Sequence, residues 1–358
     1  MISMTEHDLG VTGGVDTHAE THHAAVIDAL GRVLGSREFR ADERGYRQLL
    51  GWMRSFGRLE MVGMEGTGTY GVGLCRFLVG EEVTVIEVER PNRRSRRQHG
   101  KSDPIDAESA ARAALSRTST AAPKNRTGVL ESIRVLRAAR QGAVKARTAA
   151  INHLKALVVA APERLRAELV GLSTASQVQR CARFRCNAGR LEDHYQATKL
   201  AMRSVARRIG DLNDEITSLE SALEPLVHQA APATLALVGI GTDHAAQLLV
   251  TAGDNPDRMR SDPSFARLCG TAPIPASSGR TTRHRLHRGG DRQANRALHL
   301  AVVVRMRYCD RTKAYVERRT AEGLTRREIM RCLKRYLARE VFHTLRADMA
   351  ALHPLDDL

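Results

Sequence analysis

Four carboxylates occupy positions from which they could act together. Asp16 ends a short apolar stretch, Glu65 lies in the glycine-rich segment GMEGTGTYG, and Asp103 and Asp106 fall three residues apart in KSDPIDAESAARA. A spacing of three puts the last two side chains on one face of a helix's first turn. Converging negative charges repel one another, and divalent cations remove that repulsion. The set predicts a site for two Mg²⁺ ions, for which Mn²⁺ could substitute.

Such a pair of ions would point to chemistry on phosphodiesters. Two cations about 4 Å apart stabilise both the attacking and the leaving oxygen of an in-line displacement. The glycines around Glu65 would leave room for a nucleic-acid backbone to approach. For any one of these acids a surface or capping role is the simpler alternative, and Asp103 in particular could be only a helix N-cap. The joint pattern favours metal-assisted cleavage of a nucleic acid.

A second pattern of metal-binding residue types lies between the first two strands. The segment His18-Ala-Glu20-Thr-His22 resembles a zinc protease motif, but its glutamate stands one place late. The segment also has an extended pattern, so its two histidines would not align as they do on a helix. We therefore expect them to be surface histidines.

The elements that must position the acids alternate between strand and helix in residues 1–118. Hydrophobic patterning predicts strands at 11–16, 23–27, 32–39, 59–64 and 83–88, a helix capped by Asp42, and helices near 70–79 and 103–115. Three strands, helix, strand, helix, strand, helix is the order of an RNase H-like fold. In such a sheet the first and fourth strands are neighbours and the last helix packs against that end, so all four acids could converge.

The remainder of the chain has helical patterns. A helix is predicted at 129–159, and apolar residues from Met202 to Leu226 keep alternating steps of three and four. The two helices could form an antiparallel hairpin, an oligomerising coiled coil or an ordinary intramolecular bundle. The predicted fold class is α/β plus all-α: a catalytic domain at 1–118, a helical linker at 119–230 and a compact helical domain at 231–358.

The charge of the chain predicts a polyanionic partner. With 56 Lys and Arg against 40 Asp and Glu, the net charge is +16, which favours nucleic acid over membrane because fixed phosphates reward many separate cations. A soluble basic protein without such a partner is the alternative. One basic cluster lies just before Asp103, where it could guide a strand or an RNA toward the metals: Arg93, Arg94, Arg96, Arg97 and Lys101. Another spans residues 326–339. Aromatic residues make up only 4%, so backbone contacts should dominate recognition.

The sequence also predicts a location. The six cysteines form no CxxC pair and no disulfide-like framework, so reduced thiols are expected. The N-terminus is not of signal-peptide type, and no apolar run approaches the length of a membrane span. We expect a cytoplasmic protein that makes no membrane contact.

Five segments together resemble one protein family. GVDTHAETHHAAVID, MEGTGTY and GKSDPIDAESAARA look like the three acidic blocks of the IS110 insertion-sequence family, the DEDD transposases, also known as bridge-RNA-guided recombinases. LVGIGTDHAAQLL and LCGTAPIPASSGRTTRHRLHRGGDRQANRAL are similar to that family's C-terminal transposase domain. The resemblance runs over almost the whole chain. It implies a RuvC-like N-terminal domain, a coiled-coil linker and a C-terminal domain that holds a nucleophilic serine.

The resemblance also implies residue roles and partners. It assigns metal binding to Asp16, Glu65, Asp103 and Asp106, and the nucleophile to Ser278 of PASSG, although from the residues alone Ser277 is nearly as good a candidate. Strand joining through a phosphoserine, guidance by an element-encoded noncoding RNA that pairs with target and donor DNA, and a bacterial, nucleoid-associated homo-oligomer (a dimer or tetramer) are implied as well. In such multimers the acids of one subunit can meet the serine of another.

The segment 273–279 is predicted to be a loop. Two further features of the C-terminal part are suited to phosphate binding. Four arginines near the serines could neutralise charge that develops on a phosphate: Arg280, Arg283, Arg285 and Arg288. The turn Gly239-Ile240-Gly241, with Thr242 capping the next helix, resembles a helix-hairpin-helix turn whose backbone N–H groups could hold a phosphate. A plain helix-opening turn is the alternative.

The leading hypothesis is therefore a transposase that excises and inserts an insertion sequence by Mg²⁺-assisted serine attack on DNA. A RuvC-like junction resolvase or other structure-specific nuclease, which hydrolyses DNA with water, is the alternative. A DNA invertase of the Piv type is a close relative of the leading hypothesis. A catalytically silent DNA- or RNA-binding protein would not need four mutually repelling acids.

Overall fold

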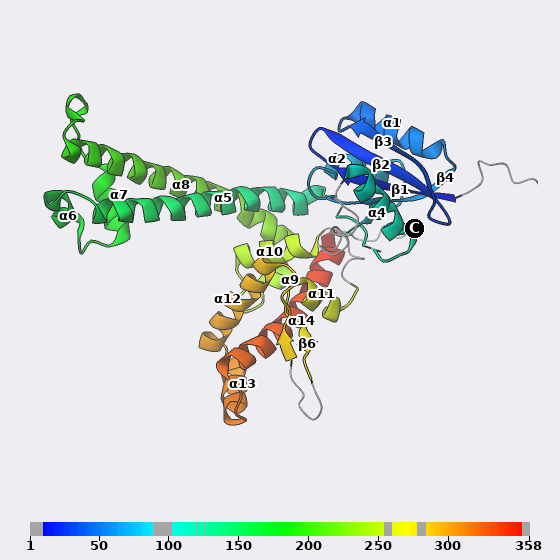
Figure 1. Cartoon of the computed structure of the whole chain (residues 1–358). Helices are drawn as coiled ribbons and strands as arrows, with labels where there is room; N and C mark the ends of the chain where they lie inside the picture. Colours follow the sequence, from blue (N-terminus) through cyan, green and yellow to red (C-terminus); the bar gives the residue numbers. More distant parts are fainter. Residues whose placement is uncertain are drawn as a thin grey trace, which may run out of the picture. The chain divides into compact units, whose positions relative to one another are not determined.

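The computed structural model describes residues 10–88, 102–119, 121–124, 126–253, 260–277 and 284–352 (Figure 1). By its internal contacts the chain divides into two compact units, residues 1–127 with 251–268 and residues 128–250 with 269–358. The first unit combines a five-stranded β-sheet with helices, and the second unit is mostly helical. The predicted three-part division at 118 and 230 stays a prediction.

The first unit is built on a five-stranded sheet with the order β3-β2-β1-β4-β5. Strand β2 is antiparallel to β1 and β3, whereas β4 is parallel to β1 and β5 is parallel to β4. The predicted succession of elements is confirmed, and the first and fourth strands are neighbours as expected. The strands are β1 (Gly10–Thr17), β2 (Thr21–Asp28), β3 (Val33–Arg40), β4 (Arg58–Met64) and β5 (Val85–Glu87).

The helices of this unit begin close to their predicted positions. Asp42 caps α1 as predicted, because its carboxylate accepts a hydrogen bond of 2.8 Å from the backbone N–H of Gly45. The last helix of the α/β region starts at Asp103, at the predicted residue. The helices are α1 (Glu43–Arg54), α2 (Val72–Gly80), α4 (Asp103–Leu115) and α11 (Asp262–Leu268).

The sheet has a helix on each face, and glycines let α4 approach closely. A Cβ on Gly14 would lie 2.1 Å from the carbonyl oxygen of Ala107, and one on Gly63 would lie 2.2 Å from that of Ala110. On the other face, a Cβ on Gly13 would meet Met53 of α1. Because side chains alternate along a strand, α4 and α1 cover opposite faces, as Figure 1 shows.

The main core of the unit lies on the α1 side of the sheet. There α1 and α2 pack against β1 and β4, and apolar side chains from all four elements are almost wholly buried: Val15, Leu49, Met53, Val62, Met64, Leu74 and Leu78. On the other side the buried residues of α4 are mostly alanines. Small residues on both partners bring the α4 backbone close to the strands, and that closeness positions the acids at the start of α4.

In the second unit two long helices pack along each other: α5 (Gly128–Val159) and α8 (His194–Ala230). Of the eight residues in the predicted seam, five are buried and Leu212, Leu219 and Leu226 are half-buried. The helices therefore pair within one chain, which is one of the arrangements that the sequence left open, and an oligomerising coiled coil stays a prediction. The helices α6 (Glu163–Leu169) and α7 (Thr174–Ala182) and the short η2 (Ala188–Arg190) connect them.

The rest of the second unit is held together by α14. The carboxylate of Asp348 accepts hydrogen bonds from the backbone N–H groups of Ala233 and Thr234, at 2.8 and 3.0 Å, and from the Thr234 hydroxyl at 2.7 Å. A buried carboxylate of α14 thus ties this helix to the start of α9. The helices are α9 (Pro232–Leu235), α10 (Thr242–Ala252, which crosses the division), α12 (Arg292–Tyr308), α13 (Asp310–Ala321) and α14 (Arg326–Leu352).

A short hairpin replaces part of a predicted loop. The sequence predicted a loop at 273–279, but β6 (Pro273–Pro275) pairs antiparallel with β7 (His284–Leu286). Proline is compatible with an edge strand, where its missing N–H is not needed by a neighbour. All six cysteines are free thiols, as expected. None of the helices within the described ranges is long and apolar enough to span a bilayer.

Candidate metal centre

The site begins where β1 ends against α4. Asp16 is the last residue but one of β1 and is 8% exposed. It is two residues beyond Gly14, so its side chain lies on the α4 face of the sheet. Asp103 is the first residue of α4 and follows the N-cap residue Ser102, so its alternative role as the N-cap is wrong. Asp106 lies one helical turn further on and is 5% exposed.

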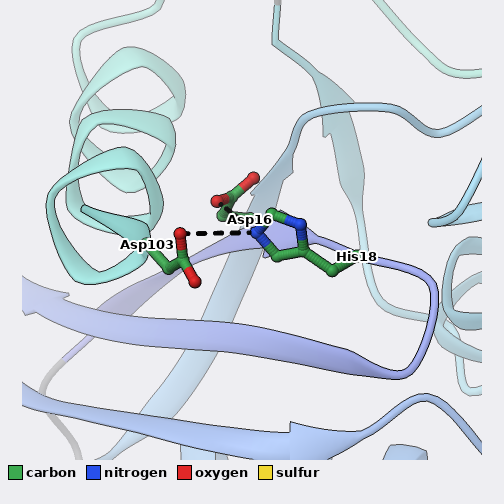
Figure 2. Close-up of side chains that lie close together, drawn as sticks. All are labelled: Asp16, His18 and Asp103. Atoms are coloured by element: carbon green, nitrogen blue, oxygen red, sulfur yellow. Dashed lines mark hydrogen bonds and ion pairs between the residues drawn. The ribbon is translucent and has the colours of Figure 1, made fainter. Parts of the chain in front are cut away.

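His18 joins two of these acids. Its Nε2 lies 3.1 Å from Oδ2 of Asp16 and 3.5 Å from Oδ1 of Asp103, so that the imidazole lies between the two carboxylates (Figure 2). The backbone N–H of His18 donates a hydrogen bond of 3.0 Å to Thr21, which closes the turn between β1 and β2. One ligand atom from each of the three side chains lies within 4.8 Å of the others.

The expectation that both histidines of the zinc-protease-like segment lie at the surface is therefore wrong. His22 is wholly buried on β2, where its ring stacks on Tyr46 at a centroid distance of 5.7 Å. Burial lowers the pKa of His22 below its ordinary value. His18 is half-exposed, but it contacts the predicted site. The signal in the sequence was the spacing of two between Asp16 and His18, rather than the protease-like spacing.

Two hydrogen bonds to backbone atoms of Glu65 hold this residue against β1, beside Asp16. It follows β4, and its N–H donates to the carbonyl of Val15 at 3.3 Å, while the Thr17 hydroxyl donates to the carbonyl of Glu65 at 3.0 Å. These two bonds hold the Glu65 backbone against β1 on both sides of Asp16. The residue is 6% exposed. The structure thus brings Asp16 and Asp103 together through His18 and holds the Glu65 backbone beside β1. Neither Glu65 nor Asp106 belongs to this close group of metal-ligating side chains among the described residues.

The glycines that follow Glu65 have a different role from the predicted one. Gly66 has a φ of +66°, which suits glycine. A Cβ on Gly66 would meet the Thr17 hydroxyl, one on Gly68 would meet Arg126, and one on Gly71 would meet Thr17 and Met64. The space beside these glycines is filled by the chain itself. They shape the turn that holds Glu65, which corrects the expectation that they leave room for DNA.

The residues present fit a divalent cation. Asp16, Glu65 and Asp106 are each more than nine-tenths buried, and buried carboxylates need compensating charge. Carboxylate oxygens are the ligands that Mg²⁺ and Mn²⁺ accept most readily, and Nε2 of His18 lies between the carboxylates of Asp16 and Asp103.

Comparison with known proteins identifies the family. Residues 13–161 match a family model for DEDD transposases of the IS110 type, described as "Transposase". Residues 234–317 match a second model, described as "Transposase IS116/IS110/IS902 family". The chain belongs to the IS110 family of transposases. The first model spans all four acids of the candidate metal centre.

Two relatives are encoded by insertion elements. The uncharacterized 43.6 kDa protein of insertion element IS110 from Streptomyces coelicolor is 33% identical over 150 residues, 40% of this chain and 36% of the relative. The uncharacterized 42 kDa protein of insertion element IS900 from Mycobacterium paratuberculosis is 28% identical over 153 residues, 42% of this chain and 38% of the relative. The matches thus span little more than a third of each relative.

The second IS110-family match includes the turn before α10. Gly239 has a φ of +85°, and a Cβ there would lie 2.7 Å from the carbonyl oxygen of Ala301 in α12. Close approach to α12 therefore accounts for this glycine. The carbonyl of Gly241 accepts the first helical hydrogen bond, 2.9 Å from the N–H of Ala245. Gly241 is thus the cap residue and Thr242 the first helical residue, which corrects the predicted cap.

Several predicted site residues of this IS110-family chain lie outside the described residues: Arg93, Arg94, Arg96, Arg97, Lys101, Ser278, Arg280 and Arg283. Ser277 is exposed and follows β6, and Arg285 and Arg288 are exposed in and after β7. A cavity of about 730 Å³ lies between this hairpin and α14. Most of its charged lining residues are basic: Arg285, Arg319, Arg331, Lys334 and Arg335, with Glu328 as the acid.

Proposed function

We propose that this chain is a DNA transposase that cleaves and rejoins strands with divalent cations held by Asp16, Glu65, Asp103 and Asp106 in an RNase H-like domain. One observation carries the proposal. In a chain of the IS110 family, Asp16 and Asp103 lie close together where β1 ends against α4, with Glu65 directly after β4 and Asp106 on the first turn of α4. The strand order supports the RNase H-like assignment, because the first and fourth strands are neighbours.

The chain's own residues would position the reacting groups. When bound, the cations would supply Lewis-acid stabilisation of the attacking and leaving oxygens. The backbone bonds of Glu65 to β1 and the close packing of α4 hold the backbones that carry these acids, which supports a preorganised site. Mg²⁺ is the proposed ion and Mn²⁺ the proposed substitute.

The proposed nucleophile is the hydroxyl of Ser278, with Ser277 as the alternative. In the proposed step a bond forms between the serine oxygen and phosphorus, and the bond from phosphorus to one deoxyribose oxygen breaks. The serine proton leaves to a base or water, and the departing oxygen takes up a proton. The energy of the phosphodiester is thereby kept for rejoining. Exposure of Ser277 on the hairpin and the basic cavity between that hairpin and α14 support DNA binding there.

The proposed partners follow from charge and family. A net charge of +16 suits DNA and an element-encoded guide RNA, with contacts to nucleic-acid backbones by basic residues before Asp103 and at 280–288, and by backbone N–H groups of the turn at Gly239 and Gly241. A homo-oligomer in which the acids of one subunit meet the serine of another is part of the proposal.

A strand-transfer assay tests the proposal. Donor and target plasmids are incubated with the full chain and Mg²⁺, with and without the RNA encoded beside its gene. Wild type is expected to give recombinant plasmid and a protein–DNA adduct that survives denaturation. Ser278→Ala is expected to lose both, with Ser277→Ala as the matched control.

Three other outcomes would contradict parts of the proposal. Cleavage without any adduct, unchanged in both serine variants, would support the nuclease that uses water. Inversion of a segment in place of transfer would support the Piv-type invertase. DNA binding without any cleavage in Mg²⁺ would support the catalytically silent protein.

A further inference from the structure

His18 is the one non-carboxylate donor among the metal-ligating side chains that the described residues bring together. It lies in the turn between β1 and β2, and its N–H bond to Thr21 fixes the start of that turn. Its ring is directed at Asp16 and Asp103 (Figure 2). The side chain of His18 is 43% exposed and is not part of the main core of the first unit, so core packing does not account for an imidazole here.

The distances around His18 are those between neighbouring ligands of one ion. In octahedral coordination at about 2.1–2.2 Å, two adjacent ligand atoms lie about 3 Å apart. Nε2 lies 3.1 Å from the Asp16 oxygen and 3.5 Å from the Asp103 oxygen. The three donors come from the end of β1, the turn that follows it and the first residue of α4. Gly14 of β1 and Gly63 of β4 hold α4 close to these strands, so only small side-chain movements would close the donors around a cation.

We propose that His18 is a nitrogen ligand of the ion that Asp16 and Asp103 hold, and that this ligand makes Mn²⁺ a stronger competitor with Mg²⁺ than it would be at a site of oxygen donors alone. The inference rests on the proposed metal centre. Imidazole suits transition metals, whereas Mg²⁺ is bound by oxygen donors and water. One nitrogen among carboxylates raises the affinity for Mn²⁺ more than that for Mg²⁺.

A second role for His18 predicts a different result. The imidazole could act as a placeholder that neutralises Asp16 and Asp103 only until a cation arrives. The ion would then displace His18 and would have oxygen ligands only. The two roles differ in whether a nitrogen nucleus lies in direct contact with the bound ion.

Pulsed electron paramagnetic resonance on the full chain with one equivalent of Mn²⁺ distinguishes these roles, because a coordinated imidazole gives a resolved ¹⁴N coupling. The coupling is expected in wild type and is expected to vanish in His18→Gln. His23→Gln is the matched control, since His23 lies opposite Asp16 in the β1–β2 register but bonds to the Ser36 hydroxyl at 2.8 Å. This control should keep the coupling.

Competition between the two ions gives a second readout. His18→Gln is expected to weaken Mn²⁺ binding about tenfold and to change Mg²⁺ binding less. A lower concentration of Mg²⁺ should therefore be enough to displace Mn²⁺ from the variant than from wild type. Bound Mn²⁺ without ¹⁴N coupling in wild type, or coupling that persists in His18→Gln, would overturn the role of His18 and leave the metal centre intact. If wild type and Asp16→Asn both bound Mn²⁺ only negligibly, the role of His18 and the proposed metal centre would both be overturned.

Discussion

Two buried titratable side chains, one at the end of β1 and one at the start of β2, have different consequences for function and stability. Asp16 is directed to the α4 face and belongs to the candidate metal centre. His22, on the opposite face, is wholly buried against Tyr46 in the main core. Its imidazole has no part in the proposed chemistry, so its ionisation should be visible in stability alone.

We expect His22→Phe to remove part of the acid sensitivity of the first unit. Burial lowers the pKa of His22 below 6.5, so the unfolded chain takes up the proton before the folded chain does. The free energy of unfolding contributed by this residue is therefore largest above pH 6.5 and is lost as the pH falls through that value. Urea unfolding at pH 7.5 and 5.5 should show a smaller loss for His22→Phe than for wild type. An equal loss in both proteins would contradict this prediction.

At the scale of elements, the contact of α4 with β1 and β4 connects packing to the site. The two glycines under α4 leave no space for a side chain, because a Cβ on either would lie within 2.2 Å of a backbone oxygen. A bulkier residue must displace the helix that carries Asp103 and Asp106. Stability and metal binding should therefore fall together when this contact is disturbed.

Gly14→Ala is expected to cost about 1–3 kcal/mol of unfolding free energy, the range for overpacking, and to weaken Mn²⁺ binding. Gly51→Ala on α1 is the matched control, since nothing lies within 4 Å of a Cβ there. Within a helix that change should stabilise by about 0.5–1 kcal/mol and leave the metal centre unchanged. Urea unfolding and a Mn²⁺ titration measure both effects. Unchanged Mn²⁺ affinity in Gly14→Ala would show that α4 does not set the site.

Local patterns predicted the elements of the first unit well, because strands and helices follow from side-chain periodicity and from caps such as Asp42. They also singled out Asp16 and Asp103, which the structure brings together. His18 was missed because its place depends on the geometry of a turn rather than on a repeat. The β6–β7 hairpin was missed because it depends on pairing between residues about ten positions apart, and its prolines indicated a loop.

At the scale of the whole molecule, the chain combines an acidic centre with a strongly basic remainder. The net charge of +16 attracts phosphate backbones, and the buried acids need cations before a phosphate can approach them. The two properties complement each other only if metal and DNA meet at the same place. That meeting is the central claim of the proposed function.

The rate of DNA strand cleavage by wild type and by Asp106→Asn tests this claim most directly. Asp106 is buried on α4, and the amide keeps its shape while it removes the charge that would hold a cation. We expect wild type to cleave DNA that carries its element ends in Mg²⁺ or Mn²⁺ and to stop in EDTA. Asp106→Asn should cleave about a thousandfold more slowly, which corresponds to about 4 kcal/mol of lost transition-state stabilisation, while binding the same DNA equally well. Cleavage by Asp106→Asn at the wild-type rate would contradict the account.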